Sequence, residues 1–158
     1  MANLHEIPPF PNPGVRLIKE DAHVAIWEEV FEPGKPTLPH RHMRDYVAAY
    51  PHGGELTIIP LAGEPEEFTT LVGEIQESTS AKDGVRLVFS AGAMIHGRVP
   101  AEGTAHYAVN EGQQPTLMIL TEIRAVFSAV RPLVGSGSWH PIRQNSAPEW
   151  WQPSSKGT

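Results

Sequence analysis

The chain has 158 residues, of which 40% are hydrophobic and 19% charged, as expected for one globular domain long enough to bury a core. Its formal net charge of −6 argues against nucleic acid or an anionic membrane as the main partner, and the absence of cysteine excludes disulfides, iron–sulfur clusters and thiolate chemistry. The chain has no apolar run of about 18 residues and no signal-peptide pattern at its N-terminus, so we expect a cytoplasmic protein without a membrane span.

The predicted elements begin after a proline-rich segment, residues 1–14, which we expect to form an extended N-terminal arm. From residue 15 to residue 126, short β-prone runs alternate with turn signals, and no helical period interrupts them. This pattern predicts an all-β sandwich or barrel. The predicted strands are 15–19, 23–31, 38–43, 45–50, 55–59, 68–72, 73–79, 85–89, 94–99, 104–110 and 116–126.

Residues 127–158 differ in composition and form a predicted C-terminal tail. Three of the four tryptophans of the chain, Trp139, Trp150 and Trp151, lie in this segment. Because exposed tryptophan is unfavourable, we expect the tail to pack on the barrel or on a partner subunit.

Two histidines, His40 and His42, lie two residues apart in a segment predicted to be extended. Side chains of a strand alternate between its faces, so both imidazoles should point the same way. Two neutral imidazoles on one face provide half of a transition-metal site.

The segment around these histidines resembles the first motif of the cupin family, Gly-x5-His-x-His-x3/4-Glu-x6-Gly. Gly34, His40, His42 and Gly53 occupy the corresponding positions, and Tyr46 stands where the glutamate is usual. The resemblance therefore leaves the fourth ligand of the family's metal site unaccounted for.

A second segment, Gly103-x2-His106-x3-Asn110, resembles the core of the second cupin motif, with Ala101 where proline is usual. Together the two motifs identify residues 15–126 as similar to a single-domain cupin, a double-stranded β-helix or jelly-roll barrel. Within the cupins, the chain looks most like the small BauB-type proteins associated with β-alanine degradation.

The resemblance implies that His40, His42 and His106 hold one divalent transition metal inside the barrel. Fe(II) is favoured by analogy with three-histidine cupins, and Zn, Ni, Mn or Cu would also suit three imidazoles. Tyr46 shares the face of His40 and His42, either as a ligand or as a hydrogen-bonding neighbour. We favour the second role, because a phenol with a pKa near 10 is a poor ligand at neutral pH. Strand alternation turns Asp45 away from this face.

Two further residues are candidates for the substrate-binding wall. His96 either faces the substrate or is a neutral strand histidine bonded to the backbone. Arg98 either pairs with a substrate carboxylate through its planar guanidinium or forms a salt bridge on the rim.

The leading functional hypothesis is an Fe(II) dioxygenase-type oxidoreductase that acts on a small organic acid or related metabolite, with an anionic substrate among those expected. Tyr46, Arg98 and His96 would orient the substrate. The alternatives are a metal-dependent lyase, isomerase or hydrolase, and a non-catalytic cupin that binds a small molecule. We expect a homodimer, because cupins commonly pair through their barrel edges.

Overall fold

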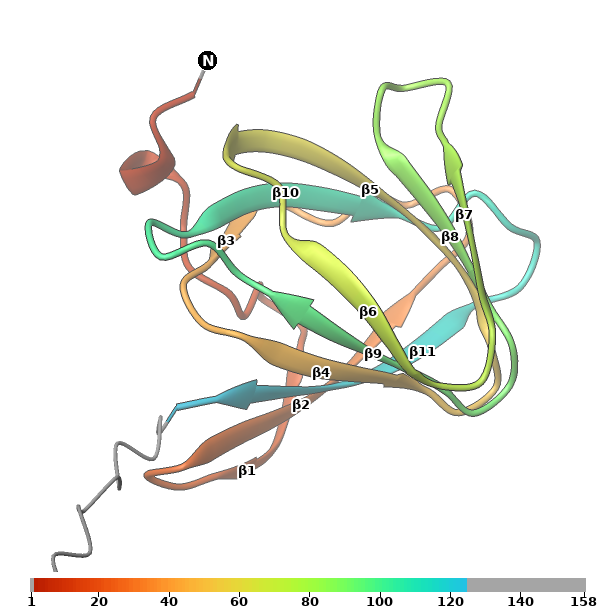
Figure 1. Cartoon of the computed structure of the whole chain (residues 1–158), viewed down its shortest axis with the longest axis horizontal. Helices are drawn as coiled ribbons and strands as arrows, with labels where there is room; N and C mark the ends of the chain where they lie inside the picture. The colour runs from red at the N-terminus through yellow and green to blue at the C-terminus, as the bar shows by residue number, and fades with distance from the viewer. Residues whose placement is uncertain (1, 125–158) are drawn as a thin grey trace, which may run out of the picture. The chain divides into compact units, whose positions relative to one another are not determined.

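The computed structural model describes residues 2–124, which contain eleven β-strands and one short 3-10 helix (Figure 1). The predicted C-terminal tail, residues 127–158, lies outside the described residues, as do residues 125 and 126 at the end of the last predicted strand. The elements are η1 (Leu4–Glu6), β1 (Arg16–Glu20), β2 (Val24–Phe31), β3 (His40–His42), β4 (Tyr46–Tyr50), β5 (Gly54–Gly63), β6 (Glu67–Val72), β7 (Ile75–Thr79), β8 (Val85–Phe89), β9 (Ala93–Arg98), β10 (Thr104–Val109) and β11 (Thr116–Ile123).

The strands form two antiparallel sheets that face each other (Figure 1). The six-stranded sheet has the order β1-β2-β11-β4-β9-β6, and the five-stranded sheet has the order β3-β10-β5-β8-β7. Without β1, β6 and β7, each sheet keeps four strands, β2-β11-β4-β9 and β3-β10-β5-β8, an arrangement of two four-stranded sheets that is typical of a jelly roll. The predicted all-β, jelly-roll architecture is confirmed.

The core lies between the two sheets and follows the alternation of side chains along each strand. In β2, Ala25, Trp27 and Phe31 are buried on the inner face, and Leu120 of β11 packs with them. Tyr50 stacks on Phe89 from the opposite sheet with ring centroids 3.6 Å apart. The alternation of side chains along the strands, rather than the loops, thus decides which side chains lie in the interior.

The N-terminal arm lies along β3 rather than running free. Phe10 N–H donates to the Arg41 carbonyl at 2.9 Å, and Arg41 N–H donates to the Pro8 carbonyl at 2.9 Å. The guanidinium of Arg41 also donates to the His5 carbonyl at 2.7 Å. Backbone and side-chain groups of β3 thus hold the proline-rich arm in place.

Two predicted boundaries are wrong for identifiable reasons. The strand predicted for residues 55–59 continues in β5 as far as Gly63, because β10 pairs along this whole segment with a register shift between Ala105 and His106. The strand predicted from residue 73 begins at Ile75, since Gly73 has a φ of +74° and belongs to the preceding turn. Among residues 2–124, no helix is long and apolar enough to cross a membrane.

Candidate metal centre

The three histidines of the cupin-like motifs come from two neighbouring strands. β3 carries His40 and His42, both buried on one face with Arg41 between them. β10 pairs with β3 so that His106 is the register partner of His40 and Thr104 that of His42. Since strand alternation and this register place all three imidazoles on the inner face, sequence spacing and sheet pairing together build the cluster.

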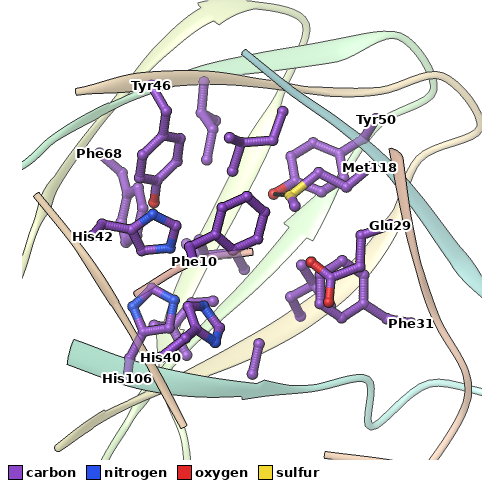
Figure 2. Close-up of a pocket in the computed structure, with 16 residues that line it drawn as sticks. Phe10, Glu29, Phe31, His40, His42, Tyr46, Tyr50, Phe68, His106 and Met118 are labelled. Atoms are coloured by element: carbon purple, nitrogen blue, oxygen red, sulfur yellow. Dashed lines mark hydrogen bonds between the residues drawn. The ribbon is translucent and has the colours of Figure 1, made fainter. Parts of the chain in front are cut away.

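The three imidazoles point toward one another in the interior (Figure 2). Each can offer a ring nitrogen such that all three nitrogens lie within 4.8 Å of one another. The ring centroid of His106 lies 4.7 Å from that of His40 and 5.1 Å from that of His42. Three ring nitrogens grouped within this distance form a candidate site for one transition-metal ion.

Burial keeps two of these imidazoles neutral. Desolvation, followed by the nearby His106, lowers the pKa of His40 to about 4, and the same causes hold the pKa of His42 well below its usual range. Neutral imidazole is the form that binds a metal. His40 Nδ1 lies 3.0 Å from the Leu38 carbonyl and 2.9 Å from the Asn12 side-chain amide, which leaves Nε2 facing the cluster.

His106 has a different environment. Its Nδ1 lies 2.8 Å from Glu66 Oε1, but the N–H direction is off the line to the oxygen, so Nδ1 is buried without an aligned hydrogen bond. Such an unsatisfied buried nitrogen, in a set of neutral imidazoles beside a carboxylate, fits a site whose rings are ordered by a bound cation. The residues present therefore fit a divalent transition metal.

Tyr46 lies beside His42, with ring centroids 4.9 Å apart, and is buried. Its hydroxyl donates a hydrogen bond to Glu66 Oε1 at 3.3 Å. Desolvation first, and the Glu66 carboxylate second, raise the pKa of Tyr46 well above its usual value, so the phenol stays protonated at neutral pH. This arrangement favours the hydrogen-bonding alternative over a phenolate ligand.

A cavity of about 30 Å³ adjoins the three histidines, which is room for about two water molecules. Apolar and aromatic side chains make up most of its wall, and no lysine or arginine of residues 2–124 contributes to it. Phe10 of the N-terminal arm, the lining residue that lies outside the strands, stacks on His42 with ring centroids 5.0 Å apart. The arm thus covers the metal-facing end of the cavity.

Glu29 of β2 also lines this cavity, opposite the histidines and beside Phe31 (Figure 2). Burial raises the pKa of Glu29 to about 7. A carboxyl group in this state can accept or donate a proton near neutral pH.

The structure does not bring His96 and Arg98 to the cavity. Along β9 the buried positions are Ala93, Ile95 and Gly97, so His96 and Arg98 point outward. His96 Nε2 lies 3.2 Å from the Asp45 carboxylate, and Arg98 lies 3.8 Å from the exposed Glu67. Both residues occupy the outer face, where Arg98 forms the rim contact that was its alternative role.

Three residues near the site have no place in the sequence motifs: Phe10, Glu29 and Glu66. The sequence pattern did indicate that Glu29 could face the interior, because it lies two residues from both Trp27 and Phe31, which are buried on one face of β2. Glu66 lies in an acidic turn between β5 and β6, and no pattern distinguishes it from Glu64 or Glu67. Phe10 is a single apolar residue among prolines, which also gives no signal.

Comparison with known proteins gives structural likenesses only. No family model matches the chain, and no curated protein matches it. A cupin domain from Bordetella pertussis is 21% identical over 73% of this chain and 99% of that chain, with a TM-score of 0.49. An uncharacterised protein with a double-stranded β-helix domain from Klebsiella pneumoniae is 17% identical over 78% and 89% of the two chains, with a TM-score of 0.32. Drosophila melanogaster CENP-C bound to CAL1 is 18% identical over 77% and 84%, with a TM-score of 0.39.

The fold assignment rests on the strand order and not on these likenesses. The order of the two sheets is that of the jelly roll implied by the sequence resemblance, and the histidines of both motifs meet in its interior. The described part of the chain is therefore a jelly-roll barrel with a buried three-histidine cluster.

Proposed function

We propose that the chain is a metal-dependent cupin that binds one divalent transition metal through His40, His42 and His106 and acts on a small molecule. The observation that carries this proposal is the convergence of three buried imidazoles whose ligand atoms lie within 4.8 Å of one another. Retaining three such imidazoles in a barrel interior is costly unless they bind something.

Within this class, we favour an Fe(II) dioxygenase-type reaction on a small organic acid or related metabolite. A divalent metal held by three neutral ligands keeps its full charge and open coordination positions, which suits an anionic substrate together with O₂. Cupins that lack the motif glutamate, such as thiol dioxygenases, resemble this ligand set. No cationic side chain of the described residues lines the cavity, so a substrate carboxylate would depend on the metal for its counter-charge.

In this reaction, the side chains around the metal would keep water away from it and would control where protons lie. Phe10 and the apolar wall separate the cluster from solvent. The Tyr46 hydroxyl directs its proton to Glu66, so it presents oxygen lone pairs, rather than its proton, to the cavity.

Glu29 favours a second candidate function, a lyase, isomerase or hydrolase reaction. These reactions need a group that takes a proton from the substrate or from water, and Glu29 is a cavity carboxyl group with a pKa of about 7. In the dioxygenase proposal Glu29 has no required role.

Two measurements test these proposals. Metal analysis of protein purified without oxygen is expected to give about one equivalent of metal per chain, and its absence after reconstitution would contradict both functions. Oxygen uptake is then followed with a panel of small carboxylates, thiols and diketones. Substrate loss with stoichiometric oxygen uptake supports the dioxygenase, whereas loss without oxygen uptake, abolished in Glu29→Gln, supports the second function.

A further inference from the structure

Glu66 is a buried carboxylate beside the three-histidine cluster, although neither sequence motif contains it. It lies between β5 and β6 and is 8% exposed. Its Oε1 lies 2.8 Å from His106 Nδ1 and accepts a hydrogen bond from the Tyr46 hydroxyl at 3.3 Å. Its Oε2 accepts a hydrogen bond from Thr104 Oγ1 at 3.4 Å.

No lysine or arginine of the described residues balances the charge of Glu66. Within residues 2–124 it forms no ion pair with lysine or arginine, and two of its contacts come from neutral hydroxyl groups. A buried carboxylate without a counter-charge is costly. If His106 is to bind a metal it must stay neutral, so the balancing charge has to come from the metal itself.

The position of Glu66 also decides which nitrogen of His106 is available. A histidine that binds a metal through one ring nitrogen usually donates the N–H of the other to a carboxylate or a carbonyl group, and this second bond fixes the tautomer and the ring orientation. Nδ1 of His40 lies in a comparable setting, 3.0 Å from the Leu38 carbonyl and 2.9 Å from the Asn12 side-chain amide. Glu66 stands at the same nitrogen of His106, with Oε1 2.8 Å from Nδ1.

We propose that Glu66 is a positioning residue of the metal centre, which holds His106 through Nδ1–H and supplies the negative charge that the motif position of Tyr46 lacks. The inference rests on the proposed metal binding and deepens it. Tyr46 then has a defined part: it replaces the motif carboxylate with a hydroxyl group that anchors a carboxylate from another loop. The centre keeps a nearby anion while all of its protein ligands are neutral.

The test compares Glu66→Gln with Glu67→Gln in the full-length protein. Glu67 is the next residue, but its side chain is 78% exposed and faces Arg98, so it is a matched control. Metal-free protein is titrated with Co²⁺, and affinity is measured by competition with a chelator. Glu66→Gln is expected to weaken Co²⁺ binding by about 10- to 100-fold, as for other partners of metal-bound histidines, and Glu67→Gln to leave it unchanged.

The outcomes separate this inference from the proposed function. If the wild type and Glu67→Gln bind no Co²⁺, the proposed function fails. If Glu66→Gln binds as tightly as the wild type, the positioning role alone is wrong. A crystal structure of the Co²⁺ protein with a Glu66 oxygen at about 2.1 Å from the ion would also overturn it, by making Glu66 a direct ligand.

A second variant keeps the inference testable if Glu66→Gln does not fold. Tyr46→Phe keeps the ring and removes only the hydroxyl group that holds Glu66. It is expected to retain Co²⁺ with an affinity reduced by a smaller factor than in Glu66→Gln. Unchanged affinity in Tyr46→Phe, with Glu66→Gln unfolded, would count against the network.

Discussion

Gly97 of β9 is the register partner of Tyr46 of β4, and the missing side chain at Gly97 makes room for the phenol ring. A Cβ atom at Gly97 would lie 2.4 Å from Tyr46 Cζ and 2.6 Å from Cε2. The backbone of Gly97 does not have the positive φ found at eight other glycines, so space, and not backbone conformation, requires glycine here. The pair fixes the ring that replaces the motif glutamate.

Gly97→Ala is therefore expected to destabilise the protein by about 1–3 kcal/mol, because the buried ring must move or the strands must separate. Urea unfolding measures the change. The same substitution in a Tyr46→Leu background should cost much less, since leucine lacks the far end of the ring. An equal cost in both backgrounds would show that the ring is not the obstacle.

His106→Ala is expected to abolish metal binding, because it removes one of three ligands. Tyr46→Phe should keep the metal and lower turnover, since the hydroxyl orients Glu66 without binding the ion. Metal content after dialysis and initial rates measure the two effects. His96→Ala is the matched control and should keep the metal, because His96 lies on the outer face of β9. Metal loss in Tyr46→Phe equal to that in His106→Ala would make Tyr46 a ligand.

Glu29→Gln is expected to change how stability depends on pH. The Glu29 carboxyl has a pKa of about 7 in the folded protein and an ordinary value of 4.5 when it is solvated, so the folded state binds more protons between these pH values. The free energy of unfolding of the wild type thus loses up to about 3 kcal/mol from this group as pH rises through that window. Glu29→Gln removes the loss.

Urea unfolding at pH 5 and pH 8 should therefore show Glu29→Gln gaining stability relative to the wild type at the higher pH. Glu28→Gln is a suitable control, because Glu28 points to the other face and pairs with Arg16. A Glu29→Gln variant whose stability difference does not change with pH would rule out a buried, protonatable Glu29.

In metal-free protein, the histidine cluster should make stability fall as the pH is lowered, which is opposite to the effect of Glu29. Folding lowers the pKa of His40 from 6.5 to about 4, so the unfolded state binds more protons in this window and stability falls as the solution is acidified. The full loss for His40 alone, reached below pH 4, is about 3 kcal/mol. In urea unfolding, His40→Gln should lose less free energy of unfolding than the wild type between pH 7 and pH 5. A loss equal to that of the wild type would contradict a buried, neutral His40.

Phe10→Ala is expected to lower the free energy of unfolding by about 3–5 kcal/mol, because the ring packs on Trp27 and His42 in the interior. The same variant should release bound Zn²⁺ to a chelator faster, since Phe10 covers the metal-facing end of the cavity. Leu38→Ala, at a residue that is 61% exposed, is the control and should change stability by less than about 0.5 kcal/mol. Similar losses in both variants would show that the arm contributes little.

The sequence by itself determined the strands and the shared face of His40 and His42, and its resemblance to the second cupin motif implied that His106 joins them. The strands and the shared face are local features, because strand alternation fixes the face of a side chain from its position alone. The same alternation grouped His96 with Arg98, but it could not say whether their face was the inner or the outer one. That choice depends on the facing sheet, and burial of Ala93, Ile95 and Gly97 turned both residues outward.

Only the tertiary structure brought Phe10, Glu29 and Glu66 to the histidines. Their positions depend on contacts between distant segments: the arm on β3, the register of β2 with β11, and the turn between β5 and β6 beside β10. The shared face of His40 and His42 thus followed from local periodicity, and His106 from the resemblance to the second motif. The charges and the covering ring around them depended on long-range packing, which no single stretch of the sequence encodes.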